Sequence, residues 1–204
     1  MTRKRVPRVV TAEQVAARQP GSTPEAQLAS KELYAGKIFR LDRDTVQFPD
    51  GSRAEMDIVR HSGASAIVPF MSDPEGDDPQ LLLLRQYRYA AGGFIYEVPA
   101  GRLDAGESPA TCAARELKEE TGCTAATLEP LFTMFTTPGF TDEKIHVFMA
   151  TGLSHGATAR EADEFADVVI MSLAEALELI RTGAIMDAKS ALSILYVAGF
   201  KTGA

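Results

Sequence analysis

Short runs in which apolar and polar residues alternate follow one another in the first third of the chain. Residues 33–39 and 44–48 are β-prone, and residues 53–61 alternate as a strand with one covered face does. Between the last two runs lies Pro-Asp-Gly-Ser at 49–52, a strong turn sequence because proline fixes φ and glycine accepts a positive φ. The pattern predicts an antiparallel β unit over residues 29–62.

Longer apolar runs follow and predict buried strands. Residues 64–71 are apolar, a polar loop covers 73–79, and residues 80–88 include consecutive leucines at 81–84. Residues 94–98, 127–135, 145–151 and 168–171 predict further strands. These strands are numerous enough to form the sheet of a full domain.

Three helices are predicted from the signals at their ends. Ser108 is a good N-cap for a helix over 109–121, and Gly122 suits the end of that helix. Ser172 and Glu175 form a capping box that opens a helix through residue 181. Asp187 can cap a last helix over 188–198. Strands that enclose one helix and are followed by two more predict an α/β fold with helices on both sides of a sheet.

The first 28 residues form a separate segment of the sequence. They open with the basic stretch Thr-Arg-Lys-Arg-Val-Pro-Arg at 2–8, which no apolar signal core follows, so secretion is not expected. Acidic Glu13 and Glu25 weaken the alternative of an organelle transit peptide. We interpret 1–28 as a flexible basic tail, 29–62 as a β unit for dimerisation, and 63–204 as the main domain.

Composition narrows the classes of function. The chain has 204 residues and a formal net charge of −7, which argues against a nucleic-acid-binding surface, and it has no apolar run as long as a membrane span. Its two cysteines, Cys112 and Cys123, fall at opposite ends of one predicted helix, about 16 Å apart and too far for a disulfide. Its three histidines show no zinc-ligand spacing. We therefore expect reduced cysteines and a cytoplasmic location.

Three carboxylates gather on one side of the helix predicted over 109–121. On a helical wheel, Glu116, Glu119 and Glu120 fall within an arc of about 100°. Arg115 can pair with Glu119 four residues on, but the remaining repulsion favours a hard divalent cation, Mg²⁺ or alternatively Mn²⁺. A solvated acidic helix face is the competing interpretation. The apolar face that packs on the sheet is predicted on the adjoining arc, at Ala110, Ala113, Ala114 and Leu117.

A glycine-rich loop before the helix completes a longer motif. Loop and helix together resemble the Nudix box, whose fixed positions are all filled, by Gly101, Glu107, Arg115, Glu116, Glu119, Glu120 and Gly122. Four flanking segments resemble the ADP-ribose pyrophosphatase branch of that family. They are Arg-Gln-Tyr-Arg at 85–88, Glu-Val-Pro-Ala-Gly at 97–101, the run 137–146 around Pro138, and Glu-Ala-Asp-Glu-Phe at 161–165.

The resemblance implies an α/β/α sandwich around a mixed sheet, beside the N-terminal antiparallel β unit. It also implies a metal site in which Glu116, Glu120 and the backbone carbonyl of Ala100 are ligands and Glu119 shares their role. Arg115 would hold a carboxylate in place by ion pairing. Glu107, the last acid before the helix, would support the loop or an outer metal site.

Two further sets of residues follow from the same resemblance. One acid of the 161–165 loop would be the general base for the attacking water, with Glu164 favoured and Glu161 and Asp163 close behind. Substrate contacts are expected at Arg88, Glu97, Pro138 and Glu143. The first three also have simpler interpretations, as a surface cation, an exposed strand residue and a turn residue.

The resemblance predicts Mg²⁺-dependent hydrolysis of the pyrophosphate bond of ADP-ribose, or of a related nucleoside diphosphate sugar, to AMP and ribose 5-phosphate. It also implies a homodimer in which the N-terminal strands of one subunit build part of the neighbouring active site. The alternatives are a pyrophosphatase for GDP-mannose or another nucleotide sugar, a ligand sensor without catalysis, and an RNA-end pyrophosphohydrolase, which the acidic charge disfavours. A sensor would be expected to lack some of the box carboxylates, and none is missing.

Overall fold

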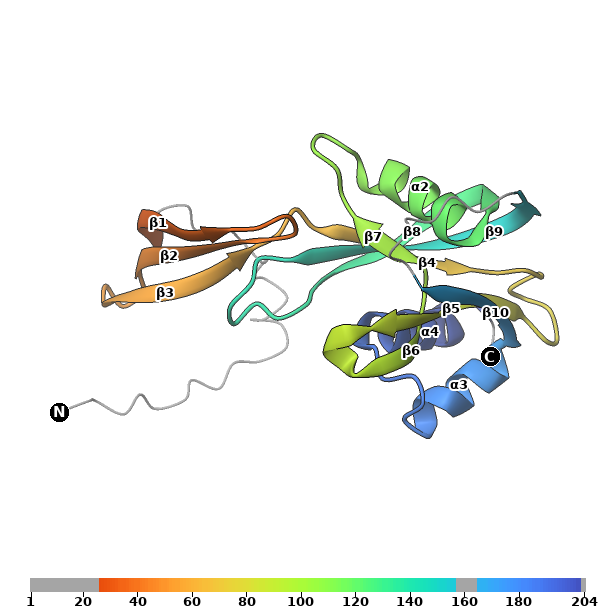
Figure 1. Cartoon of the computed structure of the whole chain (residues 1–204). Helices are drawn as coiled ribbons and strands as arrows, with labels where there is room; N and C mark the ends of the chain where they lie inside the picture. Colours follow the sequence, from red (N-terminus) through yellow and green to blue (C-terminus); the bar gives the residue numbers. More distant parts are fainter. Residues whose placement is uncertain (1–25, 157–164, 203–204) are drawn as a thin grey trace.

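A computed structural model describes residues 26–156 and 165–202 of the chain. The N-terminal part is an antiparallel sheet in the order β1 (Gln27–Ala35), β2 (Arg40–Gln47) and β3 (Arg53–Arg60). Figure 1 shows this sheet projecting from one end of the main body. The predicted β unit is therefore present, although its first strand begins at Gln27, inside the segment that we interpreted as tail.

The strand predicted over 33–39 is wrong in its second half. β1 ends at Ala35, and the chain turns through a hydrogen bond from the Gly36 N–H to the Phe39 carbonyl, 2.9 Å long. A Cβ on Gly36 would lie 2.8 Å from the ring of the exposed Tyr34, so the glycine lets this ring fold against the turn. Ile38 and Phe39 are exposed at the tip of the hairpin, so their apolar character does not mark a buried strand.

The described residues of the main domain form two sheets. A mixed sheet has the order β7 (Ala100–Arg102), β4 (Ala64–Pro69), β9 (Lys144–His155) and β8 (Cys123–Phe135), with β4 and β9 parallel. An antiparallel sheet has the order β10 (Ala166–Ser172), β5 (Gln80–Arg88) and β6 (Gly93–Glu97), and the short 3₁₀ helix η2 (Tyr89–Ala91) joins its last two strands. The helices are α2 (Pro109–Thr121), α3 (Leu173–Arg181) and α4 (Ala188–Phe200).

Helices lie on both sides of these sheets, as predicted (Figure 1). On one side, Ala113 and Leu117 of α2 pack with Ile67, Leu82 and Phe148. The larger core lies on the other side, where residues of β4, β5 and β9 pack with α3 and α4. No helix within the described residues is long and apolar enough to cross a membrane.

The predicted apolar face of α2 needs correction. Ala113 and Leu117 are buried, but Ala110 and Ala114 are exposed. The buried face is instead rotated toward the carboxylates and consists of Cys112, Ala113, Glu116, Leu117, Glu120 and Thr121. The reason is that α2 packs against β7 as well as β4 and β8, so one carboxylate edge of the helix is covered by backbone.

The helix ends confirm the predicted caps. Ser108 accepts a hydrogen bond from the Thr111 N–H at 3.1 Å, and Gly122 ends α2 with a φ of 74°. Both bonds of the capping box between Ser172 and Glu175 are present at the start of α3. These caps fix where α2 begins and ends and hence which of its residues reach the edge of the sheet.

Two sets of contacts attach the N-terminal sheet to the domain. The Val59 N–H of β3 donates to the Phe140 carbonyl at 2.8 Å, in the loop between β8 and β9. Arg102 of β7 donates from Nη1 to the Lys37 carbonyl at 2.7 Å, at the tip of the β1–β2 hairpin. The hairpin tip therefore lies beside the strand that leads into α2.

Candidate active site

A cavity of about 440 Å³ opens where β5, β7, α2 and the β1–β2 hairpin meet. It is lined by both basic and acidic side chains, and each of the four elements contributes a cation. Its charged or polar lining residues are Lys37, Gln86, Arg88, Arg102, Asp104, Arg115, Glu116, Glu119 and Glu120. The predicted carboxylate arc thus faces a cleft in which a phosphate could meet several positive charges.

Gly101 lets the backbone of β7 approach the helix closely. A Cβ at this position would lie 1.9 Å from Oε1 of Glu116, closer than two non-bonded heavy atoms can lie. No other residue type fits without displacing this carboxylate. The first glycine of the box is therefore explained by contact with Glu116 and not by its φ.

Arg115 joins three of the box carboxylates. Its Nε and Nη2 each donate to Glu107 at 3.0 Å, and Nη1 donates to Glu116 at 2.6 Å and to Glu119 at 3.0 Å. The predicted pair with Glu119 is present, and the guanidinium also reaches two acids that spacing alone did not assign to it. One cation thus orients the loop before α2 and the helix itself.

Glu107 holds the loop in shape. Its carboxylate accepts from the Asp104 N–H at 3.1 Å in addition to Arg115. These hydrogen bonds, chiefly those from Arg115, lower the pKa of Glu107 to about 2 from its ordinary 4.5. Glu107 is consequently ionised at any physiological pH and supports the loop geometry.

Glu120 lies against the backbone of Ala100. Its Oε2 accepts from the Ala100 N–H at 2.9 Å, and its side chain is buried, as is that of Glu116. The predicted metal ligands Ala100, Glu116, Glu119 and Glu120 all line the same cavity. In the described part of the chain no three His, Cys, Asp or Glu residues are gathered closely enough to enclose an ion. The oxygen donors nevertheless have the chemistry that Mg²⁺ prefers.

Arg88 is held by the carboxylate of Glu97, for which the sequence left two interpretations, a substrate contact and an exposed strand residue. Glu97 is only 5% exposed, which excludes the interpretation as an exposed strand residue. Its Oε2 accepts from Arg88 Nη2 at 2.7 Å, and its Oε1 lies 3.1 Å from Lys189 Nζ at the start of α4. Both oxygens are engaged by cations, so in this structure Glu97 positions Arg88. Lys189 had no sequence signal beyond its place next to the cap of the last helix.

Pro138 and Glu143 do not line this cavity. They lie in the loop between β8 and β9, where Glu143 accepts from Thr136 Oγ1 at 2.9 Å and lies 3.4 Å from Nδ1 of His61. The loop packs on β3 of the N-terminal sheet. The three candidates for the general base, Glu161, Asp163 and Glu164, lie outside the described residues.

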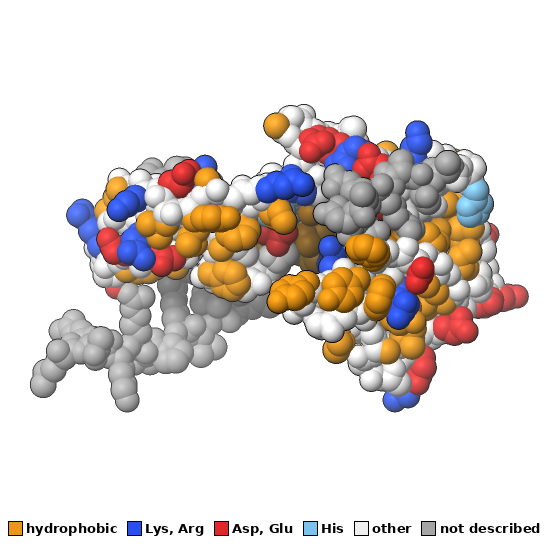
Figure 2. Space-filling view, viewed as in Figure 1, with side chains coloured by type: hydrophobic (Ala, Val, Ile, Leu, Met, Phe, Trp, Pro, Cys, Tyr) orange, Lys and Arg blue, Asp and Glu red, His pale blue; other side chains and the backbone are white. Residues whose placement is uncertain are grey.

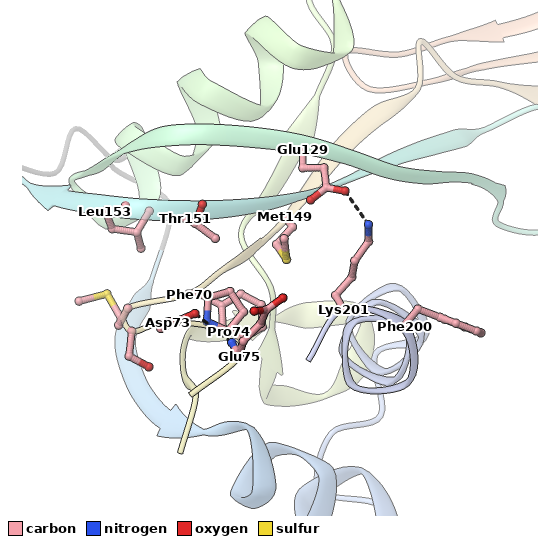
Figure 3. Close-up of a pocket in the computed structure, with 13 residues that line it drawn as sticks. Phe70, Asp73, Pro74, Glu75, Glu129, Met149, Thr151, Leu153, Phe200 and Lys201 are labelled. Atoms are coloured by element: carbon pink, nitrogen blue, oxygen red, sulfur yellow. Dashed lines mark hydrogen bonds and ion pairs between the residues drawn. The ribbon is translucent and has the colours of Figure 1, made fainter. Parts of the chain in front are cut away.

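The larger hollow of the described structure is elsewhere. A cavity of about 780 Å³ lies between the segment at 70–75, strands β8 and β9, and the end of α4 (Figure 3). Lys201 and Glu129 pair across it at 2.5 Å. It contains none of the predicted site residues, so size alone does not identify the catalytic cleft.

Comparisons with known proteins agree with the geometry. The profile of the NUDIX domain matches residues 61–190. The ADP-ribose pyrophosphatase of Bacillus subtilis is 37% identical over 178 residues, which cover 86% of this chain and 94% of the relative. A protein of Bacillus methanolicus described as a methanol dehydrogenase activator is 35% identical over 175 residues, 85% of this chain and 92% of the relative. A solved structure of an ADP compounds hydrolase has the same fold, with a TM-score of 0.72 at 23% identity, covering 85% of this chain and 92% of that one.

Proposed function

The chain belongs to the NUDIX domain family, and from this premise we propose that it hydrolyses the pyrophosphate bond of a nucleoside diphosphate sugar. The proposed substrate is ADP-ribose, and the products are AMP and ribose 5-phosphate. The observation that carries the proposal is the meeting of Glu116, Glu119 and Glu120 with Arg88 and Arg102 in one cavity. The relative from B. subtilis, an ADP-ribose pyrophosphatase, supports the choice of substrate.

A divalent ion, in our proposal Mg²⁺ or alternatively Mn²⁺, would be held by Glu116, Glu120 and the Ala100 carbonyl, with Glu119 sharing the role. When bound, such an ion neutralises the phosphate oxygens that repel a nucleophile. Arg115 keeps two of these carboxylates in place through Nη1. The Ala100 N–H donates to Glu120, which holds the start of β7 beside the carboxylates.

The remaining steps fall to cations and to an acid. Arg88, oriented by Glu97, contacts a phosphate oxygen and stabilises the charge that develops on the leaving phosphate. Arg102 lines the cavity beside it and supplies a second positive charge. We propose that one acid among 161, 163 and 164 removes the proton of the attacking water, with Glu164 favoured.

A substrate panel with product identification tests the reaction. With Mg²⁺ present, we expect the purified protein to release AMP and ribose 5-phosphate from ADP-ribose faster than it cleaves other nucleotide sugars. Faster cleavage of GDP-mannose would move the assignment to that substrate. Binding of ADP-ribose without cleavage of any substrate would instead favour a ligand sensor.

The matched variants are Glu116→Gln in the cleft and Glu178→Gln on α3. We expect Glu116→Gln to lower kcat by at least about 100-fold, because a charged ligand is replaced by a neutral one. Glu178 is a surface residue paired with Arg181, so its variant should keep wild-type turnover. Equal activity of Glu116→Gln and wild type would overturn the assigned ligand set.

We further propose a homodimer built through the N-terminal sheet. All nine residues of β1 are exposed, and Figure 2 shows apolar side chains spread over this sheet and across to the main body. The exposed apolar residues of the sheet and its turns are Leu28, Leu33, Tyr34, Ile38, Phe39 and Phe48. An exposed apolar sheet of this kind marks a surface that another chain covers. Light scattering during size-exclusion chromatography should give twice the mass of one chain.

The compartment is also a proposal. Cys112 and Cys123 are free and buried, and burial, the main cause, raises the pKa of the Cys112 thiol to about 11. Neither thiol is therefore suited to form a disulfide, which is consistent with a reducing, cytoplasmic environment.

A further inference from the structure

Gln86 is the residue of the cleft whose chemistry nothing so far explains. It lies in β5 two residues before Arg88, is 4% exposed, and lines the cavity with the carboxylates. Its Oε1 is the one buried side-chain nitrogen or oxygen that lacks a hydrogen-bond partner within residues 26–156 and 165–202. The buried carboxylates of the cleft, Glu116 and Glu120, accept hydrogen bonds from Arg115 and from the Ala100 N–H.

An unpaired buried amide oxygen is costly to keep. Leaving such a group without a partner costs a protein about 1–3 kcal/mol, and a leucine of similar size would avoid the cost. The preceding residues of β5 at this side of the sheet, Leu82 and Leu84, are buried leucines. Contacts within the folded chain therefore do not explain why a polar residue follows these two leucines on the same face of β5.

The position of the amide points to a ligand. Side chains alternate along a strand, so Gln86 projects to the same side of β5 as Arg88, which we propose to contact phosphate. Phosphate oxygens at neutral pH carry no proton to donate, and the amide oxygen can only accept a hydrogen bond. Beside the diphosphate of a nucleoside diphosphate sugar, the groups that have a hydrogen to donate are the O–H groups of the adjoining sugars and of the attacking water, so we take an O–H group as its partner.

We propose that Gln86 is a substrate-binding residue whose amide oxygen accepts a hydrogen bond from an O–H group beside the diphosphate. This inference rests on the proposed function. The O–H group is a hydroxyl of a substrate sugar or the attacking water. In both cases, the hydrogen bond forms only when the cleft is filled, which accounts for the missing partner.

The test compares Gln86→Leu with wild type, using Gln80→Leu as the matched control on the same strand. The Gln80 amide donates only to surface Asp78, so its loss should leave turnover unchanged. We expect Gln86→Leu to lower kcat/KM for ADP-ribose by about 3-fold to 10-fold, the loss of one neutral hydrogen bond. The melting temperature without substrate should equal or exceed that of wild type, because an unpaired oxygen has been removed.

ADP-ribose analogues that lack single sugar hydroxyls, and an ADP alkyl ester without the distal sugar, separate the two sources of the O–H group. If a sugar hydroxyl is the partner, the loss appears in KM and disappears with the analogue that lacks this hydroxyl. If the attacking water is the partner, the loss appears in kcat and persists with every analogue. Either result supports the role of Gln86.

Two results would overturn the inference. One is a kcat/KM for Gln86→Leu within twofold of wild type on all substrates. The other is a melting temperature several degrees lower with Gln86→Asn restoring neither activity nor stability, as expected of a purely structural residue. If wild type itself cleaves none of the panel, the proposed function fails instead, and Gln86 is then judged by calorimetric affinity of both proteins for ADP-ribose.

Discussion

The N-terminal sheet and the main domain bury opposite kinds of residue. In the domain, the largest fully buried side chains are leucines, isoleucines, valines and a phenylalanine. In the sheet formed by residues 26–60, the buried residues are Asp42 and Asp44, while its apolar side chains are half-buried or exposed. The domain therefore carries the driving force for its own folding, whereas the sheet gains most from covering its outer surface with another surface.

Ion pairs hold the centre of the N-terminal sheet together. Arg40 donates to both oxygens of Asp42 at 2.8 Å, and Arg60 bonds Asp42, Asp44 and Asp142 of the domain. The hydrogen bonds from Arg40, together with those from Arg60, outweigh burial and lower the pKa of Asp42. Such pairs give a defined geometry more than net stability. These ion pairs thus define the geometry of the N-terminal sheet but add little to its free energy of unfolding.

The largest effect on stability is expected when a leucine of the domain is replaced by alanine, compared with the same replacement in the N-terminal sheet. Leu117→Ala opens a cavity under α2 and should lower the free energy of unfolding by about 2–5 kcal/mol, measured by urea denaturation. Leu33→Ala on β1 should change the stability of a single chain little, because Leu33 is 40% exposed, but it should weaken dimerisation. A large loss of monomer stability from Leu33→Ala would contradict the contrast between the regions.

A smaller effect is expected at the charged centre. Arg60→Met removes the cation shared by Asp42, Asp44 and Asp142, and should destabilise the sheet locally by about 1–3 kcal/mol. Hydrogen exchange should become faster in β1, β2 and β3 and stay unchanged in β4 and α2. Uniformly faster exchange would show that the two regions unfold as one unit.

The smallest effect is a pH dependence within the domain. The folded-state pKa of Glu107, about 2, lies below its ordinary 4.5, so its contribution to stability is complete above pH 4.5 and is lost as the pH falls toward 2. Urea denaturation at several pH values should show wild type and Glu107→Gln converging over this range. A difference that stays constant from pH 6 to pH 2.5 would show that ionisation of Glu107 is not involved.

Local signals in the sequence predicted most of the fold. The caps at Ser108, Ser172 and Asp187 and the turn at 49–52 depend on neighbouring residues, and the structure confirms them. The exposed Ala114 could not be predicted, because the face of α2 that packs is decided by β7, a three-residue strand with no periodicity. Short-range patterns determine helix ends, whereas orientation depends on contacts between distant segments.

In the candidate site, too, short-range patterns were predictable from the sequence and contacts between distant segments were not. The spacing within the box predicted which carboxylates share a cavity, since all lie on one helix and its loop. It could not predict that Lys189, ninety-two positions after Glu97, neutralises that acid, or that Gln86 keeps an unpaired oxygen. These features arise only when β5, β6 and α4 meet in space.

Arg102 holds the hairpin tip through the main-chain carbonyl of Lys37, with a longer bond to that of Ile38. A bond to the main chain does not depend on which side chains the tip carries. The rim of the cleft can therefore be redesigned at positions 37 and 38 without detaching the hairpin. These two positions offer protein engineers a way to retune the choice of sugar while the reacting groups stay as they are.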